Sequence, residues 1–332
     1  MSKPIALVTG GAGFIGSHMV DRLLAKDYQV RVVDNLSGGH EKNLAHHAGN
    51  PDLDVAWRDI RGLGPDDAVF SEVDLILHFA GIGDIVPSID APAEYMETNV
   101  QGTVAILEGA RNNGVGKFVY AASSSCYGDK VAVPTREDHP KDPQYPYALS
   151  KFMGEMAVMH WHRLYGLPAN SIRIFNAYGP RVRTTGAYGA VFGVFLKQKL
   201  ENKPLTIVGD GTQSRDFIYV TDVAAAFFAA ATTSLSGEIW NVGAGNPQTI
   251  NRLAELIEGE RQHLPRRPGE PDCTWADISK ITTELNWRPS VPFESGVANM
   301  LDDIEAWKDA PLWDPASIAE ATKTWFHHLG SE

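Results

Sequence analysis

The hydrophobic positions of this chain fall into short apolar runs, separated by longer segments whose apolar residues recur at helical spacing. Such short runs predict buried strands, and the segments 92–113 and 147–165 have the length and spacing of amphipathic helices. The expected strands are residues 5–8, 30–33, 55–57, 74–79, 118–122 and 171–175. Strands that alternate with helices in this way predict an α/β fold, a doubly wound parallel sheet of the Rossmann type.

The alternation weakens in the second half of the chain. Residues 176–216 combine loops with one expected helix near 189–200 and one expected strand at 205–208. Residues 216–241 predict a strand, an alanine-rich helix and a strand that return to the main sheet, and residues 246–332 are mostly helical between prolines. We therefore expect a Rossmann domain of residues 1–175 plus 217–245, and a smaller, mostly helical substrate domain of residues 176–216 plus 246–332.

Composition narrows the classes of function. The 332 residues carry a formal net charge of −12, which argues against general binding to nucleic acid or to anionic membranes. No apolar run approaches the roughly 18 residues of a membrane span, and the expected first strand leaves no room for a signal peptide. Two cysteines, Cys126 and Cys273, form no disulfide framework. A cytoplasmic protein is therefore expected.

A glycine-rich turn follows the first expected strand. Gly10, Gly13 and Gly16 stand at the spacing G-x-x-G-x-x-G and lead into an amphipathic segment. A strand, a tight glycine turn and a helix N-terminus together present backbone N–H groups to a pyrophosphate. The second strand ends in Asp34, where a carboxylate would accept the adenosine ribose hydroxyls and repel a 2′-phosphate. The pattern predicts a dinucleotide site that favours NAD over NADP.

Three residues suggest proton transfer near this site. Ser123 ends the fifth expected strand, and Tyr147 and Lys151 form a Y-x-x-x-K pair on one helical face. A nearby ammonium favours the phenolate, so that Tyr147 could take a proton from a substrate hydroxyl while a nicotinamide takes the hydride. A tyrosine packed on a lysine stem is the structural alternative. The carboxyl edge of the sheet, where open α/β folds place ligands, favours catalysis.

With these residues in place, the chain resembles the extended short-chain dehydrogenase/reductases, and within them the nucleotide-sugar epimerases and dehydratases. The resemblance runs to about residue 300. The segments that carry it are Thr9 to Gly16, Asp34 to Leu36, Asp59-Ile60, His78 to Gly81, Asn99, Ser123 with Tyr127-Gly128, Tyr147 with Lys151, Arg173 to Arg181, Gly209 to Val220 and Arg267 to Glu270.

The resemblance implies an enzyme that keeps NAD bound and acts on a nucleotide-diphosphate sugar. It implies cofactor contacts at Gly10, Gly13, Phe14, Ile15, Gly16, Asp34, Asn35, Ser37, Gly38, Asp59, Ile60, Phe79, Ala80, Gly81, Asn99, Tyr147, Lys151 and Phe175. It implies substrate contacts at Ser123, Ser124, Ser125, Asn176, Arg215, Arg267 and Thr274. Ser123, Tyr147 and Lys151 are the expected catalytic residues. No metal is expected.

The residues after Ser123 discriminate between reactions of the family. The 4,6-dehydratases that the chain resembles carry an Asp-Glu pair there and the decarboxylases a Glu, whereas this chain has Ser124-Ser125-Cys126. The absence of a carboxylate favours a 4-epimerase that oxidises carbon 4, turns the 4-keto sugar and reduces its other face. A UDP-hexose is the expected substrate, or a UDP-N-acetylhexosamine, because Thr274 stands where the family places a bulky residue.

Several alternatives stay open. They are a dehydratase or decarboxylase that takes its carboxylate from elsewhere, a net NAD-dependent dehydrogenase or reductase, and an NAD-sensing binding module. Cys126 is expected to be a small core residue and His78 a satisfied core histidine. The family usually pairs two helices between subunits, here 92–113 and 147–165, which implies a homodimer. The tail 305–332 has no assigned role.

Overall fold

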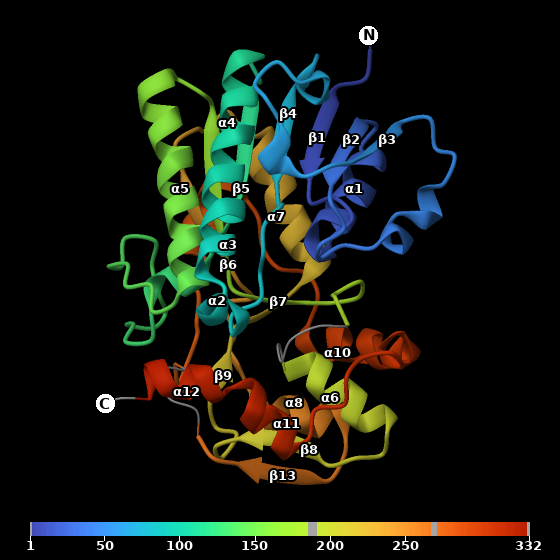
Figure 1. Ribbon diagram of the computed structural model, residues 1–332, viewed down its shortest axis with the longest axis vertical. Helices are drawn as coiled ribbons and strands as arrows, with labels where there is room; N and C mark the ends of the chain where they lie inside the picture. The colour runs from blue at the N-terminus through green and yellow to red at the C-terminus, as the bar shows by residue number, and fades with distance from the viewer. Residues whose placement is uncertain (1, 185–190, 267–270, 331–332) are drawn as a thin grey trace.

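The computed structural model describes residues 2–184, 191–266 and 271–330. Its centre is a seven-stranded sheet in which every pair of neighbouring strands is parallel (Figure 1). In spatial order the strands are β11 (Ile239–Val242), β6 (Ala169–Ile174), β5 (Lys117–Ser123), β4 (Leu75–His78), β1 (Ile5–Thr9), β2 (Gln29–Asp34) and β3 (Leu53–Trp57). This order, with β1 at the point where the direction of winding reverses, confirms the predicted Rossmann-type sheet.

Helices cover both faces of this sheet. On one face lie α1 (Phe14–Leu24) and α7 (Val220–Thr232); on the other lie α4 (Gly102–Asn112) and α5 (Pro146–Tyr165). The strands supply both cores by alternation, since Ala6 and Val8 join the core under α1 and α7 while Leu7 joins the core under α4 and α5.

The helix expected at residues 92–113 is nearly continuous. It consists of α3 (Pro92–Met96), a π-helical segment (Glu97–Gln101) and α4. The π segment contains Asn99, whose carbonyl accepts a hydrogen bond from the Thr103 hydroxyl at 2.7 Å. Such segments widen a helix locally and re-aim its side chains. Here the wider turn aims the Asn99 amide at the loop that follows β4.

A second body of structure lies beyond the carboxyl edge of the main sheet (Figure 1). Its own core combines side chains from residues 178–219 with others from residues 250–318. Its helices are α6 (Val191–Leu200), α8 (Ile250–Ile257), α10 (Phe293–Asp302) and α11 (Pro315–Ala321). Its strand pairs are β7 (Asn176–Tyr178) with β10 (Phe217–Tyr219), β8 (Leu205–Val208) with β13 (Arg261–Leu264), and β9 (Ser214–Arg215) with β12 (Gln248–Thr249).

Three elements of the second half, β10, β11 and α9, bear on the expected division into domains. Of the two strands expected in residues 216–241, β11 joins the main sheet as predicted, whereas β10 pairs with β7. The short helix α9 (Ser279–Leu285) packs Ile281 into the core under α1 and α7, although it lies in the range given to the substrate domain. The domain boundaries remain a prediction. Within the described residues, no helix is long and apolar enough to cross a membrane.

Candidate active site at the carboxyl edge of the sheet

The glycine turn after β1 is closed by contacts that exclude larger residues. Gly10 has φ +70° and its N–H donates to the Val33 carbonyl at 2.8 Å. A Cβ on Gly16 would lie 2.1 Å from the Gly10 carbonyl oxygen, so the turn and α1 approach more closely than alanine permits. Helix α1 starts after Gly13, an N-cap residue that has no side chain to cap the helix N-terminus. Its first N–H groups therefore suit an anionic ligand.

The acidic residue expected for the ribose lies beside this turn. The Asp34 carboxylate ends β2, is buried, and accepts hydrogen bonds from the N–H groups of Ala12 at 3.0 Å and Leu36 at 2.7 Å. Burial raises the pKa of Asp34, and these two hydrogen bonds oppose the rise. Each carboxylate oxygen keeps a second lone pair. Asp34 is thus a fixed acceptor at the place where a ribose would lie.

Other expected adenosine contacts gather next to Asp34. The Asn35 amide donates to Asp59 at 3.0 Å, and the Ser37 N–H donates to the Asn35 side-chain oxygen at 3.0 Å. The Arg61 guanidinium holds the pKa of Asp59 down at about 2. Ile60 is buried against Gly102, whereas Ser37 and Gly38 are exposed. The structure therefore brings these predicted contacts into one surface at the end of β2.

The segment after β4 lies between the glycine turn and α5. Phe79 packs on Phe227 with ring centroids 4.5 Å apart, and Ala80 lies against Gly10. Asn99 also has a structural role that the sequence did not predict. Its amide group binds the N–H of Ile82 at 2.8 Å, the carbonyl of the same residue, and Ser150. Asn99 therefore fixes the loop after β4, and whether it also contacts a cofactor stays a prediction.

The structure brings the three expected catalytic residues together. Ser123 ends β5 close to the Tyr147 phenol, and its hydroxyl lies 2.8 Å from the Ser125 hydroxyl. Lys151 stands one turn beyond Tyr147 on α5. Burial raises the pKa of Tyr147, and the nearby Ser123 hydroxyl opposes that rise. The expected contribution of Lys151 to the phenolate stays a prediction.

Lys151 is itself strongly perturbed. Its side chain is 7% exposed, and its ammonium lies over the Tyr120 ring, 4.5 Å from the centroid. Burial lowers the pKa of Lys151 to about 7, although the charge of Glu155 opposes the change. Among the described residues, no carboxylate lies within 4.0 Å of its ammonium. A ligand that offers hydroxyl acceptors to this ammonium would therefore relieve the burial of its charge.

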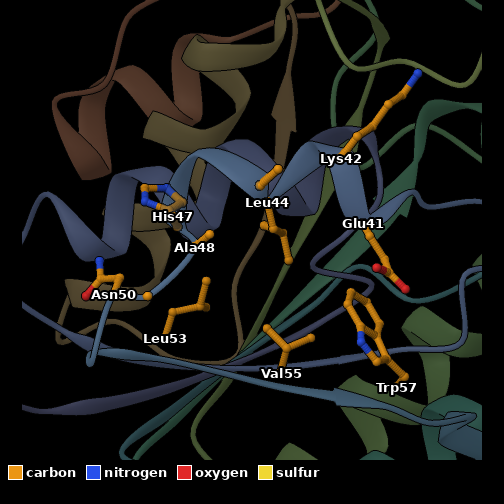
Figure 2. Close-up of a pocket in the computed structure, with 11 residues that line it drawn as sticks. Glu41, Lys42, Leu44, His47, Ala48, Asn50, Leu53, Val55 and Trp57 are labelled. Atoms are coloured by element: carbon orange, nitrogen blue, oxygen red, sulfur yellow. The ribbon is translucent and has the colours of Figure 1, made fainter.

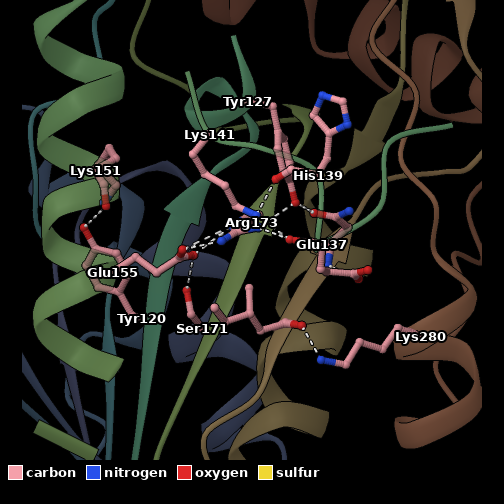
Figure 3. A network of polar contacts seen from close by, with 12 residues as sticks. Tyr120, Tyr127, Glu137, His139, Lys141, Lys151, Glu155, Ser171, Arg173 and Lys280 are labelled. Carbon is pink, nitrogen blue, oxygen red and sulfur yellow. Dashed lines mark hydrogen bonds and ion pairs between the residues drawn. The ribbon is translucent and has the colours of Figure 1, made fainter. Parts of the chain in front are cut away.

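A buried polar network lies next to Lys151 on α5 (Figure 3). Glu155, one turn beyond Lys151, accepts from the Arg173 guanidinium at 2.5 and 3.0 Å and from the Ser171 hydroxyl at 3.0 Å. Arg173, 2% exposed, also donates to the Tyr127 hydroxyl at 2.8 Å. Sequence reasoning gave Glu155 no role, although its i+4 spacing from Lys151 was a usable signal.

The expected substrate contacts lie in β7, β9 and the segment around Thr274. The Thr274 hydroxyl donates to the Asn176 side-chain oxygen at 2.7 Å and accepts from the Asp216 N–H at 3.1 Å. Arg215, in β9, donates to the carbonyl of Pro271 at 2.8 Å. Arg267 lies outside the described residues. The structure thus assembles Asn176, Arg215 and Thr274 across chain segments that are far apart in sequence.

Asp216 is a residue of this region that the sequence analysis missed. Its buried carboxylate accepts from the N–H groups of Ala244 at 2.7 Å, Gly245 at 3.1 Å and Ala276 at 2.8 Å. These bonds tie three separate loops together next to Thr274. In the sequence it is an acidic residue directly before the short apolar run 217–220, and this pattern gives no indication of its distant partners.

Two residues with possible reactive chemistry are structural. The imidazole of His78 is buried between the hydroxyls of Thr9 at 2.6 Å and Thr103 at 2.9 Å, and burial lowers its pKa to about 3. Burial raises the pKa of the Cys126 thiol to about 12, so the reactive thiolate is disfavoured. Both observations agree with the core roles predicted for these residues.

A separate hollow lies along β3, the strand at one edge of the main sheet (Figure 2). It has a volume of about 480 Å³, its floor is formed by Leu53, Val55 and Trp57, and residues 41–50 form its wall. None of the predicted site residues that the structure describes lines it. The hollow therefore gives no support to a different location for the site.

Fold and site together define the class of protein. A glycine turn, a ribose acceptor and a Ser-Tyr-Lys group at one sheet edge are typical of a dinucleotide-dependent enzyme that transfers hydride and proton together. The model of the NAD dependent epimerase/dehydratase family matches residues 6–243. The chain belongs to this family.

Known relatives match along nearly their whole length. The UDP-glucose 4-epimerase of Mycolicibacterium smegmatis is 36% identical over 309 residues, 89% of this chain and 97% of the relative. A UDP-N-acetylglucosamine 4-epimerase from Methanobrevibacter ruminantium, solved with UDP-N-acetylmuramic acid, has a TM-score of 0.87 at 31% identity, covering 92% and 99%. A UDP-glucuronic acid 4-epimerase from Bacillus cereus, solved with UDP-glucuronic acid and NAD, has a TM-score of 0.84 at 32% identity, covering 91% and 99%.

Proposed function

We propose that this protein is an NAD-dependent 4-epimerase of UDP-sugars. The observation that carries the proposal is the approach of the Ser123 hydroxyl to the Tyr147 phenol, with Lys151 one turn further along α5. Bound NAD supplies hydride acceptance at carbon 4 and hydride return. Tyr147 accepts the proton of the 4-hydroxyl and later gives it back, and Ser123 holds that hydroxyl in line. No net redox change results.

The residues of the chain fit NAD. The close approach of Gly16 to Gly10 leaves the uncapped end of α1 open to a pyrophosphate, and Asp34 is a fixed acceptor for ribose hydroxyls. Lys151 presents a buried ammonium that ribose hydroxyls would satisfy. These residues belong to the proposed Rossmann domain, residues 1–175 plus 217–245. The further contacts predicted for NAD, including Phe175, are part of the same proposal.

The proposed substrate domain, residues 176–216 plus 246–332, would hold the UDP group. Asn176, Arg215 and Arg267 suit its diphosphate, because guanidinium groups bind phosphate oxygens in a fork and offset the acidic surface locally. Thr274 is a small side chain next to Asn176. That size leaves room for an N-acetyl group, so both UDP-hexoses and UDP-N-acetylhexosamines are proposed substrates.

The alternative reactions have less support from the site. A 4,6-dehydratase or decarboxylase needs a carboxylate beside the sugar, whereas the residues after Ser123 present the Ser125 hydroxyl and the buried Cys126. Asp84 is a carboxylate near Tyr147, and it is paired with Arg183 at 3.5 Å. A sensing module would need no proton relay. A net dehydrogenase would release its cofactor, and this is the alternative that an absorbance measurement tests.

The proposed function is tested with purified protein and a panel of plain, N-acetylated and uronic UDP-sugars. We expect conversion to the 4-epimer without added NAD, read by NMR, with no change of absorbance at the nicotinamide band. Tyr147→Phe should reduce turnover by a factor of about 100 or more while NAD stays bound. Tyr165→Phe is the matched control, since Tyr165 is 48% exposed at the far end of α5. Loss of water or carbon dioxide from the sugar would contradict epimerisation.

We also propose a cytoplasmic homodimer. Cys126 and Cys273 are both free thiols, which suits a reducing compartment. Helices α4 and α5 lie side by side on the outside of the sheet (Figure 1), and α5 exposes Leu149 and Met156 there. Apolar side chains on neighbouring helices favour a four-helix contact with a second copy. Light scattering in solution tests this, and the mass of a single chain would contradict it.

A further inference from the structure

The C-terminal segment is first anchored in the core of the proposed substrate domain, called the substrate side below, and then turns back to the main sheet. Trp307 and Ile318 are buried in that core, and the Trp307 ring fills the space next to Gly193 on α6. The segment then continues into α12 (Lys323–Leu329). Helix α12 lies beside α2 (Pro87–Asp90), in the loop that follows β4, and near the N-terminal end of α5 (Figure 1).

One side chain of α12 makes the contact with α5. Trp325 is 4% exposed and packs on Tyr145, with ring centroids 5.4 Å apart and an interplanar angle of 48°. The Tyr145 ring in turn lies parallel to the Tyr147 ring, at 6.5 Å and 8°. Tyr95 meets the Tyr147 ring edge-on, at 6.5 Å and 82°. A continuous row of rings therefore runs from the C-terminal helix to the phenol that we propose as the base.

The start of α5 needs this support. Tyr145 is the residue before the helix, it makes no side-chain cap, and the helix opens with Pro146 and Tyr147. The first turn of a helix is held least firmly when its N–H groups have no capping partner. The buried Trp325 side chain packs on Tyr145, the residue before the helix, and so restrains this first turn.

We propose that Trp325 is a positioning residue for Tyr147: through Tyr145, the C-terminal helix holds the phenol at Ser123 and couples the substrate side to the catalytic residues. This rests on the proposed function. Helix α12 follows a segment anchored beside α6. A shift of the proposed substrate domain relative to the main sheet would therefore move Trp325 and, with it, the Tyr147 phenol. Misplacement of a reacting group by about 1 Å lowers a rate by a factor of about 100.

The experiment compares Trp325→Ala with Trp325→Phe and with Phe326→Ala. Phe326 is the matched control, because it is the next residue of the same helix and is 41% exposed. We expect Trp325→Ala to lower kcat for the best UDP-sugar by a factor of about 10 to 100, with KM changed less than about threefold. Trp325→Phe should restore most of kcat, and Phe326→Ala should leave kcat unchanged.

A second measurement needs no turnover. The protein is labelled with 3-fluorotyrosine, and the Tyr147 resonance is assigned by its loss in Tyr147→Phe. Trp325→Ala should shift or broaden that resonance and Phe326→Ala should not; Trp325→Leu takes the place of Trp325→Ala if the latter does not fold. A Tyr147 resonance and kcat equal to those of the unchanged protein overturn the inference, even if the unfolding temperature falls. If no UDP-sugar reacts, the proposed function fails, and the resonance alone decides about Trp325.

Discussion

Replacement of Lys151 by methionine should stabilise the cofactor-free protein, and more so at neutral pH than at alkaline pH. The ammonium is buried over the Tyr120 ring, and no described carboxylate pairs with it directly. Burial lowers the pKa of Lys151 from 10.5 to about 7. The folded protein therefore binds the proton less tightly than the unfolded chain does. Methionine keeps the apolar stem and contact with the ring, and removes the charge.

The sign and size follow from proton linkage. Between about pH 7 and pH 10.5 the unfolded chain holds more protons at this lysine, so the free energy of unfolding rises with pH in that window. By this relation, the buried lysine lowers the free energy of unfolding by about 4 kcal/mol at neutral pH and by about 2 kcal/mol at about pH 9. This loss is the penalty for burying its charge. Below about pH 7 the penalty is fully present and nearly constant. The difference of about 2 kcal/mol between the two conditions is independent of any packing that methionine changes.

Urea unfolding of both proteins at neutral pH and at about pH 9 measures this difference. The difference in free energy of unfolding between Lys151→Met and the unchanged protein should be about 2 kcal/mol larger, in favour of the variant, at neutral pH than at about pH 9. The contributions of other groups that titrate in this range cancel in the comparison, because those groups are present in both proteins. Lys203→Met is the control, since Lys203 is exposed. Parallel stability curves for the unchanged protein and Lys151→Met would refute the reasoning.

Two further substitutions test the buried structure around the site. Arg173→Met should lower the free energy of unfolding by about 3–5 kcal/mol in urea titration, because it leaves the Glu155 carboxylate buried without its cation. Adding Glu155→Leu should recover most of the loss, and a double variant no more stable than the single one would contradict this. Gly16→Ala should abolish NAD binding measured by calorimetry, because its Cβ would lie 2.1 Å from the Gly10 oxygen. Gly62→Ala, where a Cβ has open space, should bind as before.

The sequence predicted best those parts of the fold that depend on neighbours in the chain. The β1 turn needs only an apolar run, glycines at fixed spacing and a helix, and the structure places Gly10, Gly16 and Asp34 as expected. Tyr147 and Lys151 share a face because helical geometry dictates it. Their meeting with Ser123 follows from the rule that parallel strands end at one edge.

The missed features depend on contacts between distant segments. Strand β13 has largely exposed side chains and no alternation of apolar residues, so only its pairing with β8 defines it. Whether β10 joins the main sheet or β7 is likewise decided by tertiary pairing. Asn99 is a polar residue in a helix, and its partner Ile82 lies between two glycines in the loop after β4. Local pattern gives no information about such partners.

The arrangement on α5 connects stability to the proposed chemistry. Tyr147, Lys151 and Glu155 follow one another at steps of four residues, and burial increases along this face of α5 from Tyr147 toward Arg173. At the inner end the charge of Glu155 is matched by Arg173, whereas Lys151 is buried and no described carboxylate pairs with it directly. Such a group lowers the stability of the empty protein and raises its affinity for a ligand with hydroxyl acceptors. NAD binding should therefore raise the pKa of Lys151 and take up protons near neutral pH, which calorimetry in two buffers of different ionisation enthalpy would detect. An uptake that persists undiminished in Lys151→Met would show that another group gains the proton.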